Sequence, residues 1–192
     1  MARTPAPGTR DRILDTAARL FYDNGVRAVG MQQIVSETGI GKNLLYREFE
    51  SKDELVVAYL ERLRGDWGAL VAEHVEPLAD DPAAQLVALT RLAAAQASED
   101  GYRGCAFRNC YSEFPDPDNP AGRVAGAHLQ GMRRQVLAIA RRIPVADPQQ
   151  LGERVWLVVE GIYAASAHPG GRKAAANGIA MVEDLIADRL RA

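Results

Sequence analysis

The sequence predicts an all-α fold of about nine helices, and three observations support this prediction. Alternation of apolar and polar residues with period two, which a half-buried strand needs, is scarce in the 192 residues. Apolar residues instead recur at spacings of three and four from end to end. An acidic or amide residue precedes proline in the way expected at helix starts, in the pairs Asp81-Pro82, Asn119-Pro120 and Asp147-Pro148.

Three short helices are predicted in the N-terminal region. They cover about residues 9–24, 31–38 and 41–49, and the last two are joined by the tight turn TGIG at 38–41. Leu45 and Phe49 fall on one side of the third helix and predict its inward face, because each residue turns the helix by about 100°.

A long helix follows, and five more come after it. The segment SKDE at 51–54 has the spacing of a capping box, with Ser51 at N-cap and Glu54 at N3 of a helix that extends to the region of Pro77. The later helices are expected at about residues 82–98, 104–113, 120–143, 148–167 and 171–190.

Composition restricts the class of protein. Hydrophobic residues make up 47% of the chain and charged residues 25%, as in globular proteins, and no apolar run is long enough to cross a bilayer. The N-terminus leads directly into an amphipathic pattern instead of a signal-peptide core, so we expect a cytoplasmic protein. The net charge of −2 excludes a generally basic coat, so any affinity for DNA must come from a few placed contacts and a second copy of the module.

The three N-terminal helices have the spacing of a helix-turn-helix. Spacing alone leaves open a small domain with only a structural role, but the side chains of the third helix favour DNA binding. Donor groups of the kind that reach phosphates and base edges gather on its outward side and at the start of the next helix. They are Lys42, Asn43, Tyr46, Arg47 and Lys52.

Residues 10–55 resemble the DNA-binding domain of the TetR (tetracycline-repressor) family of bacterial regulators, in particular the segment IVSETGIGKNLLYREFESKDEL at 34–55. The resemblance rests on the TG turn, the LY-x-x-F core and the SK-D/E-x-L helix start. It implies that residues 1–50 form a helix-turn-helix DNA-binding domain and residues 51–192 an effector-binding and dimerisation domain. It also implies that Lys42, Asn43, Leu44, Tyr46 and Arg47 face DNA and that Lys52 contacts a phosphate.

Several positions differ from the family pattern. Val29 and Gly30 stand where the second helix usually opens with Thr or Ser, and Gly41 stands where the third helix usually has a capping hydroxyl. Leu44 replaces a common small hydroxyl residue and can read a thymine methyl group, whereas Glu48 brings a carboxylate near the phosphate backbone. These differences predict fewer phosphate contacts than usual.

Aromatic and polar residues of the C-terminal part are, as a group, candidates for an effector pocket, although each alone is better explained as core. The predicted wall and its orienting polar groups are Trp67, Tyr102, Phe107, Asn109, Tyr111, Glu113, His128, Met132, Trp156, Glu160 and Tyr163.

Cys105 and Cys110 are close in sequence, but we expect them to form neither a disulfide nor a metal site. On one helix they would point about 140° apart, which places them out of disulfide reach. A metal site built from both cysteines with His128 and Glu160 lacks any familiar ligand spacing. We therefore expect two packing residues, no metal and no cofactor.

The last two predicted helices carry apolar stripes and small residues that allow close approach, either within one chain or between two. The resemblance implies that these helices form a homodimer, which would place two recognition helices about 34 Å apart on DNA.

The sequence thus predicts a homodimeric regulator, most simply a repressor that a small, largely apolar effector releases from a palindromic DNA operator, and not an enzyme. Two alternatives remain at this point. One is a dimeric DNA-binding protein without an effector, and the other is an enzyme with Cys105 or Cys110 as nucleophile and His128 as base.

Overall fold

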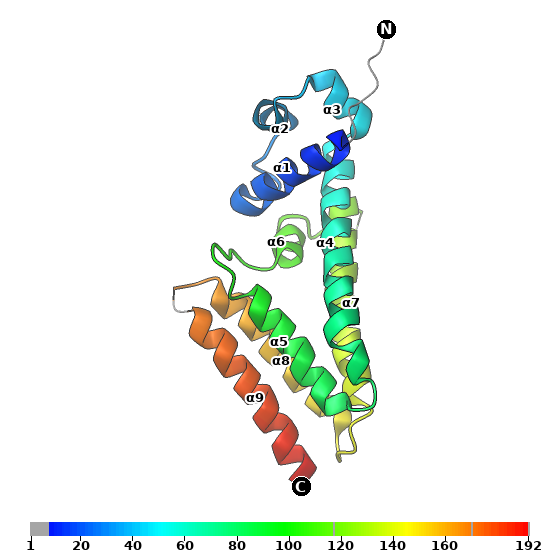
Figure 1. Cartoon of the computed structure of the whole chain (residues 1–192), viewed down its shortest axis with the longest axis vertical. Coiled ribbons are helices and arrows are strands. Elements are labelled where there is room, and N and C mark those ends of the chain that lie inside the picture. The colour runs from blue at the N-terminus through cyan, green and yellow to red at the C-terminus, as the bar shows by residue number, and fades with distance from the viewer. Residues whose placement is uncertain (1–7, 117, 170, 192) are drawn as a thin grey trace. The chain divides into compact units, whose positions relative to one another are not determined.

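The computed structural model describes residues 8–116, 118–169 and 171–191, and the regular structure of these residues is helical (Figure 1). This confirms the predicted all-α class. The helices are α1 (Thr9–Asn24), α2 (Met31–Thr38), α3 (Lys42–Glu48), α4 (Lys52–His74), the 3₁₀ helix η1 (Glu76–Leu78), α5 (Pro82–Gln96), α6 (Ala106–Glu113), α7 (Pro120–Ala140), α8 (Pro148–Ser166) and α9 (Gly171–Arg191). The described helices include none with the length and apolarity needed to cross a membrane.

Side-chain caps start the helices where the sequence predicts. The side chains of Asp81, Asn119 and Asp147 each accept a hydrogen bond from a backbone N–H three residues further on, at 2.9, 3.0 and 2.8 Å respectively. At the start of α4, the Ser51 hydroxyl accepts a hydrogen bond from the Glu54 N–H at 3.1 Å. The Glu54 carboxylate returns to the N–H of Glu50 rather than that of Ser51, so the capping box closes one residue earlier than expected.

The packing of the helices divides the chain into two compact units. The first contains the residues up to Arg64 together with Ala106–Ala127, and the second contains Gly65–Cys105 together with the residues from His128 onward. Helices α4 and α7 each contribute to both units. The boundary between the compact units therefore differs from the functional boundary that the sequence predicts between residues 50 and 51.

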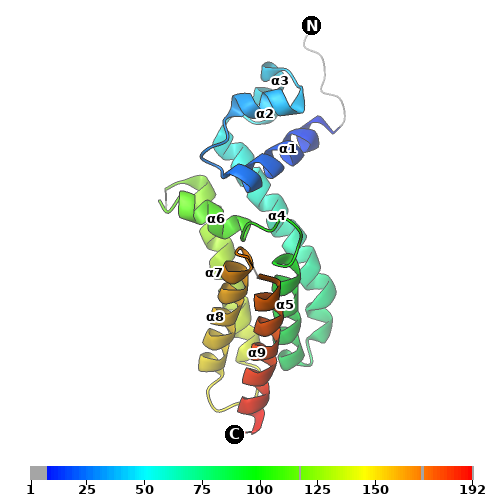
Figure 2. The same ribbon diagram turned by 90° about the vertical axis from the view of Figure 1, so that its left-hand side faces the viewer.

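In the first unit, α1, α2 and α3 group around the start of α4 (Figure 2). The rings of Phe21 and Tyr59 meet at a centroid distance of 5.8 Å and an interplanar angle of 55°. The other large side chains buried here are aliphatic or aromatic and come from every one of these helices. They include Ile13, Leu20, Ile34, Leu45, Phe49, Leu55 and Leu60.

In the second unit, α5, α8 and α9 lie side by side (Figures 1 and 2). Their facing sides bury Val155, Val159, Ile162, Val182 and Ile186. Burial of such side chains from water is the main source of stability for a helix group of this kind.

Candidate nucleic-acid interface

The turn between α2 and α3 is fixed by its own backbone and one hydroxyl. Helix α2 ends at Gly39, which has the left-handed φ of 66°, and Gly41 is extended just before α3 begins. The Thr38 hydroxyl donates to the carbonyl of Ile34 at 2.7 Å and accepts from the N–H of Ile40 at 3.4 Å. These bonds set the direction in which α3 leaves the turn.

Basic residues of α1 hold this turn and its helices together. The Arg12 guanidinium donates to the Thr38 carbonyl at 3.3 Å, and Arg19 pairs with Glu37 at 2.9 Å. The Arg10 guanidinium lies 4.0 Å from the centre of the Phe49 ring, in cation–π geometry. Part of the positive charge of the N-terminal region is therefore engaged in contacts within the protein.

Helix α3 has one buried side and one exposed side, as predicted. Leu45 and Phe49 are fully buried. Lys42, Asn43, Tyr46 and Arg47 are exposed. Leu44 is half-buried at the margin of the exposed side.

Two contacts shape the exposed side of α3. The Lys42 ammonium lies 5.8 Å from the centre of the Tyr46 ring. The Arg47 guanidinium lies 4.0 Å from the carboxylate of Glu48, whose side chain is 18% exposed. The carboxylate that the sequence places near phosphate is thus largely covered and beside a cation.

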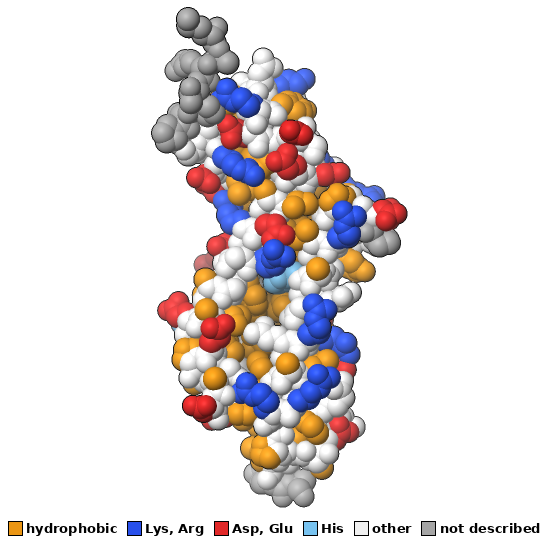
Figure 3. All heavy atoms as spheres, turned by 90° about the vertical axis from the view of Figure 1, so that its right-hand side faces the viewer, with side chains coloured by type: hydrophobic (Ala, Val, Ile, Leu, Met, Phe, Trp, Pro, Cys, Tyr) orange, Lys and Arg blue, Asp and Glu red, His pale blue; other side chains and the backbone are white. Residues whose placement is uncertain are grey.

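Basic and acidic side chains are interspersed over the face of the molecule drawn in Figure 3. A surface of this kind does not attract nucleic acid through bulk charge, which agrees with the net charge of −2. DNA binding by such a molecule depends on local contacts, and the exposed side of α3 offers side chains of the required types.

Comparison with known proteins assigns the same region to a family. The model of the family described as "Bacterial regulatory proteins, tetR family" matches residues 13–59, from α1 into α4. The transcriptional repressor ComR of Escherichia coli is 30% identical over 164 residues, which cover 80% of this chain and 77% of ComR.

The chain belongs to the TetR family. It is a DNA-binding transcriptional regulator with an N-terminal helix-turn-helix and a helical C-terminal part, in a family whose members are generally not enzymes. The crystal structure of SCO4454, a TetR-family regulator from Streptomyces coelicolor, has a TM-score of 0.87 and 29% identity over 94% of this chain and 95% of that one. The transcriptional activator FasR of Mycolicibacterium smegmatis is 40% identical over 60 residues, but these span 31% of this chain and only 27% of FasR.

Lys52, the expected phosphate contact of this TetR-family chain, is half-buried and donates to the carbonyl of Arg27 at 3.3 Å. Burial lowers the pKa of Lys52, while the carboxylates of Glu113 and Asp53 act in the opposite direction. The ammonium therefore has a structural partner in the turn between α1 and α2, and its remaining N–H donors are available for another acceptor.

The residues predicted for an effector pocket fall into both compact units. Phe107, Asn109, Tyr111 and Glu113 lie on α6 in the first unit, whereas Trp67, Tyr102, His128, Met132, Trp156, Glu160 and Tyr163 lie in the second. Tyr111 is 44% exposed. Asn109 and Glu113 border a cleft of only about 10 Å³, which is too small for an organic ligand.

Glu113 makes a contact that the sequence does not predict. Its carboxylate accepts hydrogen bonds from the backbone N–H groups of Val26 and Arg27. The sequence provides no signal for this contact, because its partners are backbone groups more than eighty residues away.

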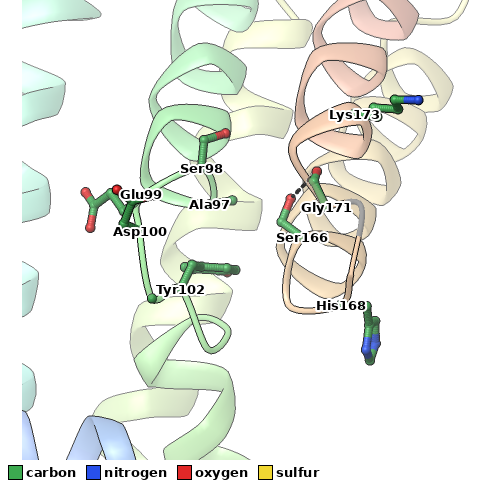
Figure 4. Close-up of a pocket in the computed structure, with 10 residues that line it drawn as sticks. Ala97, Ser98, Glu99, Asp100, Tyr102, Ser166, His168, Gly171 and Lys173 are labelled. Atoms are coloured by element: carbon green, nitrogen blue, oxygen red, sulfur yellow. Dashed lines mark hydrogen bonds between the residues drawn. The ribbon is translucent and has the colours of Figure 1, made fainter.

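The second unit contains a cavity of about 460 Å³ between the end of α5 and the segment that joins α8 to α9 (Figure 4). Tyr102 is the one predicted pocket residue in its lining, and Figure 4 shows the Tyr102 ring directed toward the Ser166 side. The rest of the lining exposes more apolar than polar surface and includes the polar residues Ser98, Ser166, His168 and Lys173.

The other candidates of the second unit serve mainly as core. Trp67, His128, Met132 and Tyr163 are buried, and Trp156 and Glu160 are half-buried. The Tyr102 hydroxyl donates to the carbonyl of Tyr163 at 3.2 Å, and the Tyr163 hydroxyl donates to the side-chain oxygen of Gln96 at 3.1 Å. These bonds connect the cavity wall to α5 and α8.

Both cysteines are buried free thiols. Cys105 lies just before α6 and not on it, so the helical angle used in the prediction does not apply. Burial, with the nearby Glu113 carboxylate as the smaller cause, raises the pKa of Cys110 to about 12. The described residues contain no group of three or more His, Cys, Asp or Glu side chains that could hold a metal ion.

Proposed function

We propose that this TetR-family chain is a homodimeric repressor that binds a palindromic operator through α3 and is released by a small-molecule effector. The observation that carries the DNA-binding part is the exposed side of α3, where Lys42, Asn43, Tyr46 and Arg47 lie opposite the buried Leu45 and Phe49. The functional division that we propose assigns DNA binding to residues 1–50 and effector binding with dimerisation to residues 51–192. Such a regulator acts in the bacterial cytoplasm, where its operator is.

Each DNA-facing residue has a chemically distinct role in this proposal. Asn43 and Arg47 read base edges in the major groove, where amide and guanidinium groups make paired hydrogen bonds. Lys42 and Tyr46, which lie one turn apart on the same side of the helix, contact phosphate. Leu44 contacts a thymine methyl, and Lys52 uses the donors left by its bond to Arg27 to reach a phosphate.

The proposed dimer forms through α8 and α9. Leu157 on α8 is 68% exposed and Met181 on α9 is 55% exposed, and both border an apolar groove of about 370 Å³. Gly161 in the same groove has open space around it, which allows a second helix to approach closely. A two-fold axis through this face would repeat α3 about one turn of DNA away, roughly 34 Å.

The proposed effector site is the cavity that Tyr102 borders. Its volume of about 460 Å³ lies within the range of small-molecule sites. Apolar surface is the larger part of its lining, which suits the largely apolar ligand that the sequence predicts, and Ser166, His168 and Lys173 offer polar groups to orient it. A compound panel followed by thermal shift tests this site, because a ligand that binds the folded state raises the melting temperature. The variant Ser98→Trp fills the cavity and should abolish the shift, whereas Glu76→Trp, which adds the same ring at an exposed site, should retain it.

We infer no catalytic role for the cysteines. The thiolate is the nucleophilic form of cysteine, and a pKa of about 12 keeps Cys110 protonated at neutral pH. Replacing both cysteines by alanine should therefore leave operator binding and release unchanged. The alternative of an enzyme predicts instead that this variant loses a turnover reaction.

DNA binding itself is tested with the DNA upstream of the chain's own gene. A gel shift at low salt should show a specific complex that unrelated DNA of equal length does not compete away. Absence of that complex, or equal competition by unrelated DNA, would contradict the proposed repressor.

A further inference from the structure

The C-terminal end of α1 leaves two backbone donors in need of partners. Helix α1 ends at Asn24, and the N–H of Gly25 still bonds to the carbonyl of Phe21 at 3.0 Å. Gly25 then takes a φ of 85°, which directs the chain out of the helix. The N–H groups of Val26 and Arg27 therefore cannot continue the helical series, and Val26 is only 3% exposed.

One carboxylate satisfies both donors. Glu113, the last residue of α6, accepts from the N–H of Val26 at 2.9 Å and from the N–H of Arg27 at 2.6 Å, with one oxygen for each. Bonds from backbone N–H groups to an ionised carboxylate are stronger than those between neutral groups. They bridge 87 and 86 residues of sequence, within the first compact unit.

Glycine at position 25 is required by the same contact. A Cβ atom added there would lie 3.1 Å from the nearer Glu113 carboxylate oxygen, and the φ of 85° is itself unfavourable for any other residue. The carboxylate thus occupies the space that a side chain at position 25 would need.

Two further contacts hold Arg27 in place. Its carbonyl accepts from the Lys52 ammonium at 3.3 Å, and its guanidinium lies 5.1 Å from the centre of the Phe114 ring. Lys52 also offsets the charge of Glu113, which stands at the C-terminal end of α1, where the helix dipole disfavours an anion. The turn between α1 and α2 is therefore fixed by Glu113 and Phe114 on one side and by Lys52 on the other.

We propose that Glu113 is a positioning residue for operator binding: it fixes the turn between α1 and α2 to the end of α6 and thereby sets the affinity of the helix-turn-helix for DNA. A module held in its binding geometry loses less conformational freedom when it meets DNA, and so binds more tightly. The proposal rests on the proposed operator binding by α3.

The test compares the full-length wild-type dimer with Glu113→Gln. The amide side chain keeps the shape of glutamate but places an NH₂ group against a backbone N–H, so one of the two bonds is lost. Hydrogen exchange at the Val26 and Arg27 amides should become faster, and the affinity for the upstream DNA should fall by about 5- to 20-fold, a range typical of coupling within regulators. Glu76→Gln removes the same charge from an exposed position and should change neither readout.

Two further variants test the contact in other ways, and the first separates the effect of side-chain length from that of charge. Glu113→Asp keeps the charge but is one methylene shorter, so it should weaken DNA binding as Glu113→Gln does. Gly25→Ala crowds the carboxylate from the other side and also strains the backbone at a φ of 85°, so it should weaken DNA binding at least as much as Glu113→Gln. Should Glu113→Gln fail to fold, Glu113→Asp carries the same comparison.

Wild-type operator affinity in a folded, dimeric Glu113→Gln would overturn the proposal, even with faster amide exchange, because Glu113 would then be structural only. Wild-type exchange at Val26 and Arg27 would also overturn it. If the wild-type protein itself forms no specific complex, the proposed operator binding fails, and amide exchange still decides whether Glu113 fixes the turn.

Discussion

The helix-turn-helix and the group formed by α5, α8 and α9 both bury apolar side chains, but they differ in how closely their helices pack and in what their exposed sides offer. In the former, short helices group around Leu45 and Phe49, and α3 presents polar and basic side chains outward. In the latter, α9 packs so closely on α8 at Gly178 that no side chain fits there. Packing therefore sets the stability of both regions, and we propose that the exposed side of α3 adjusts DNA binding.

The largest expected effect comes from the core that both regions need. Phe49→Ala removes a fully buried ring from under α3 and should lower the free energy of unfolding by about 3–5 kcal/mol. Tyr46→Ala, three residues earlier on the exposed side, should change it by less than about 0.5 kcal/mol. Chemical denaturation of both variants measures this difference, and equal losses would show that the two sides of α3 are misassigned.

Gly178 tests the close packing of α8 and α9. A Cβ atom at this position would lie 2.4 Å from Cγ1 of Ile162, so Gly178→Ala should destabilise the protein by about 1–3 kcal/mol. Gly68→Ala on α4 meets nothing within 4 Å and should be neutral or slightly stabilising. Thermal denaturation compares the two, and an unchanged melting temperature for Gly178→Ala would contradict the packing described here.

Arg47 tests the opposite behaviour, a loss of DNA binding without a loss of stability. Arg47→Ala should weaken binding to the upstream DNA by about 1–2 kcal/mol, because it removes the guanidinium that we propose reads a base. Arg134→Ala removes an exposed arginine of α7, outside the proposed DNA-binding and dimer surfaces, and serves as the charge-matched control. Fluorescence anisotropy with labelled DNA gives the affinities, and equal affinities for the two variants would remove Arg47 from the interface.

The smallest effects concern the helix caps, which should matter equally in both regions. Ser51→Ala at the start of α4 and Asp147→Ala at the start of α8 each remove an acceptor for a backbone N–H and should each cost about 1 kcal/mol. The conservative Asp147→Asn should recover most of this loss. Chemical denaturation gives the free energy of unfolding of each variant. A difference between Ser51→Ala and Asp147→Ala of much more than about 1 kcal/mol would show that the two caps differ in importance.

Local features of the sequence predicted most of the fold. The Asp-Pro and Asn-Pro pairs, the SKDE segment and the glycines at 25 and 39 act within a few residues of where they stand, and the helix limits follow them. Helices α5 and α7 end earlier than predicted, because apolar periodicity continues into the turns that follow them.

The contacts that depend on tertiary structure could not be predicted. Glu113 has the sequence context of a pocket residue, but its partners are backbone groups of a distant turn. Leu157 and Met181 were not distinguished from their neighbours on α8 and α9, because spacing alone does not tell which apolar side is covered within one chain. The lining around Tyr102 likewise brings together two separate segments, residues 97–102 and 166–173.

The most direct test of the account is the stoichiometry of the complex with the upstream DNA, measured by sedimentation of the full-length protein with a labelled duplex. The account predicts two chains on one palindromic site, and a dimer that dissociates when Leu157→Glu and Met181→Glu place charges on the exposed side of α8 and α9. A single chain bound with full affinity, or a specific complex that survives these two changes unaltered, would contradict it.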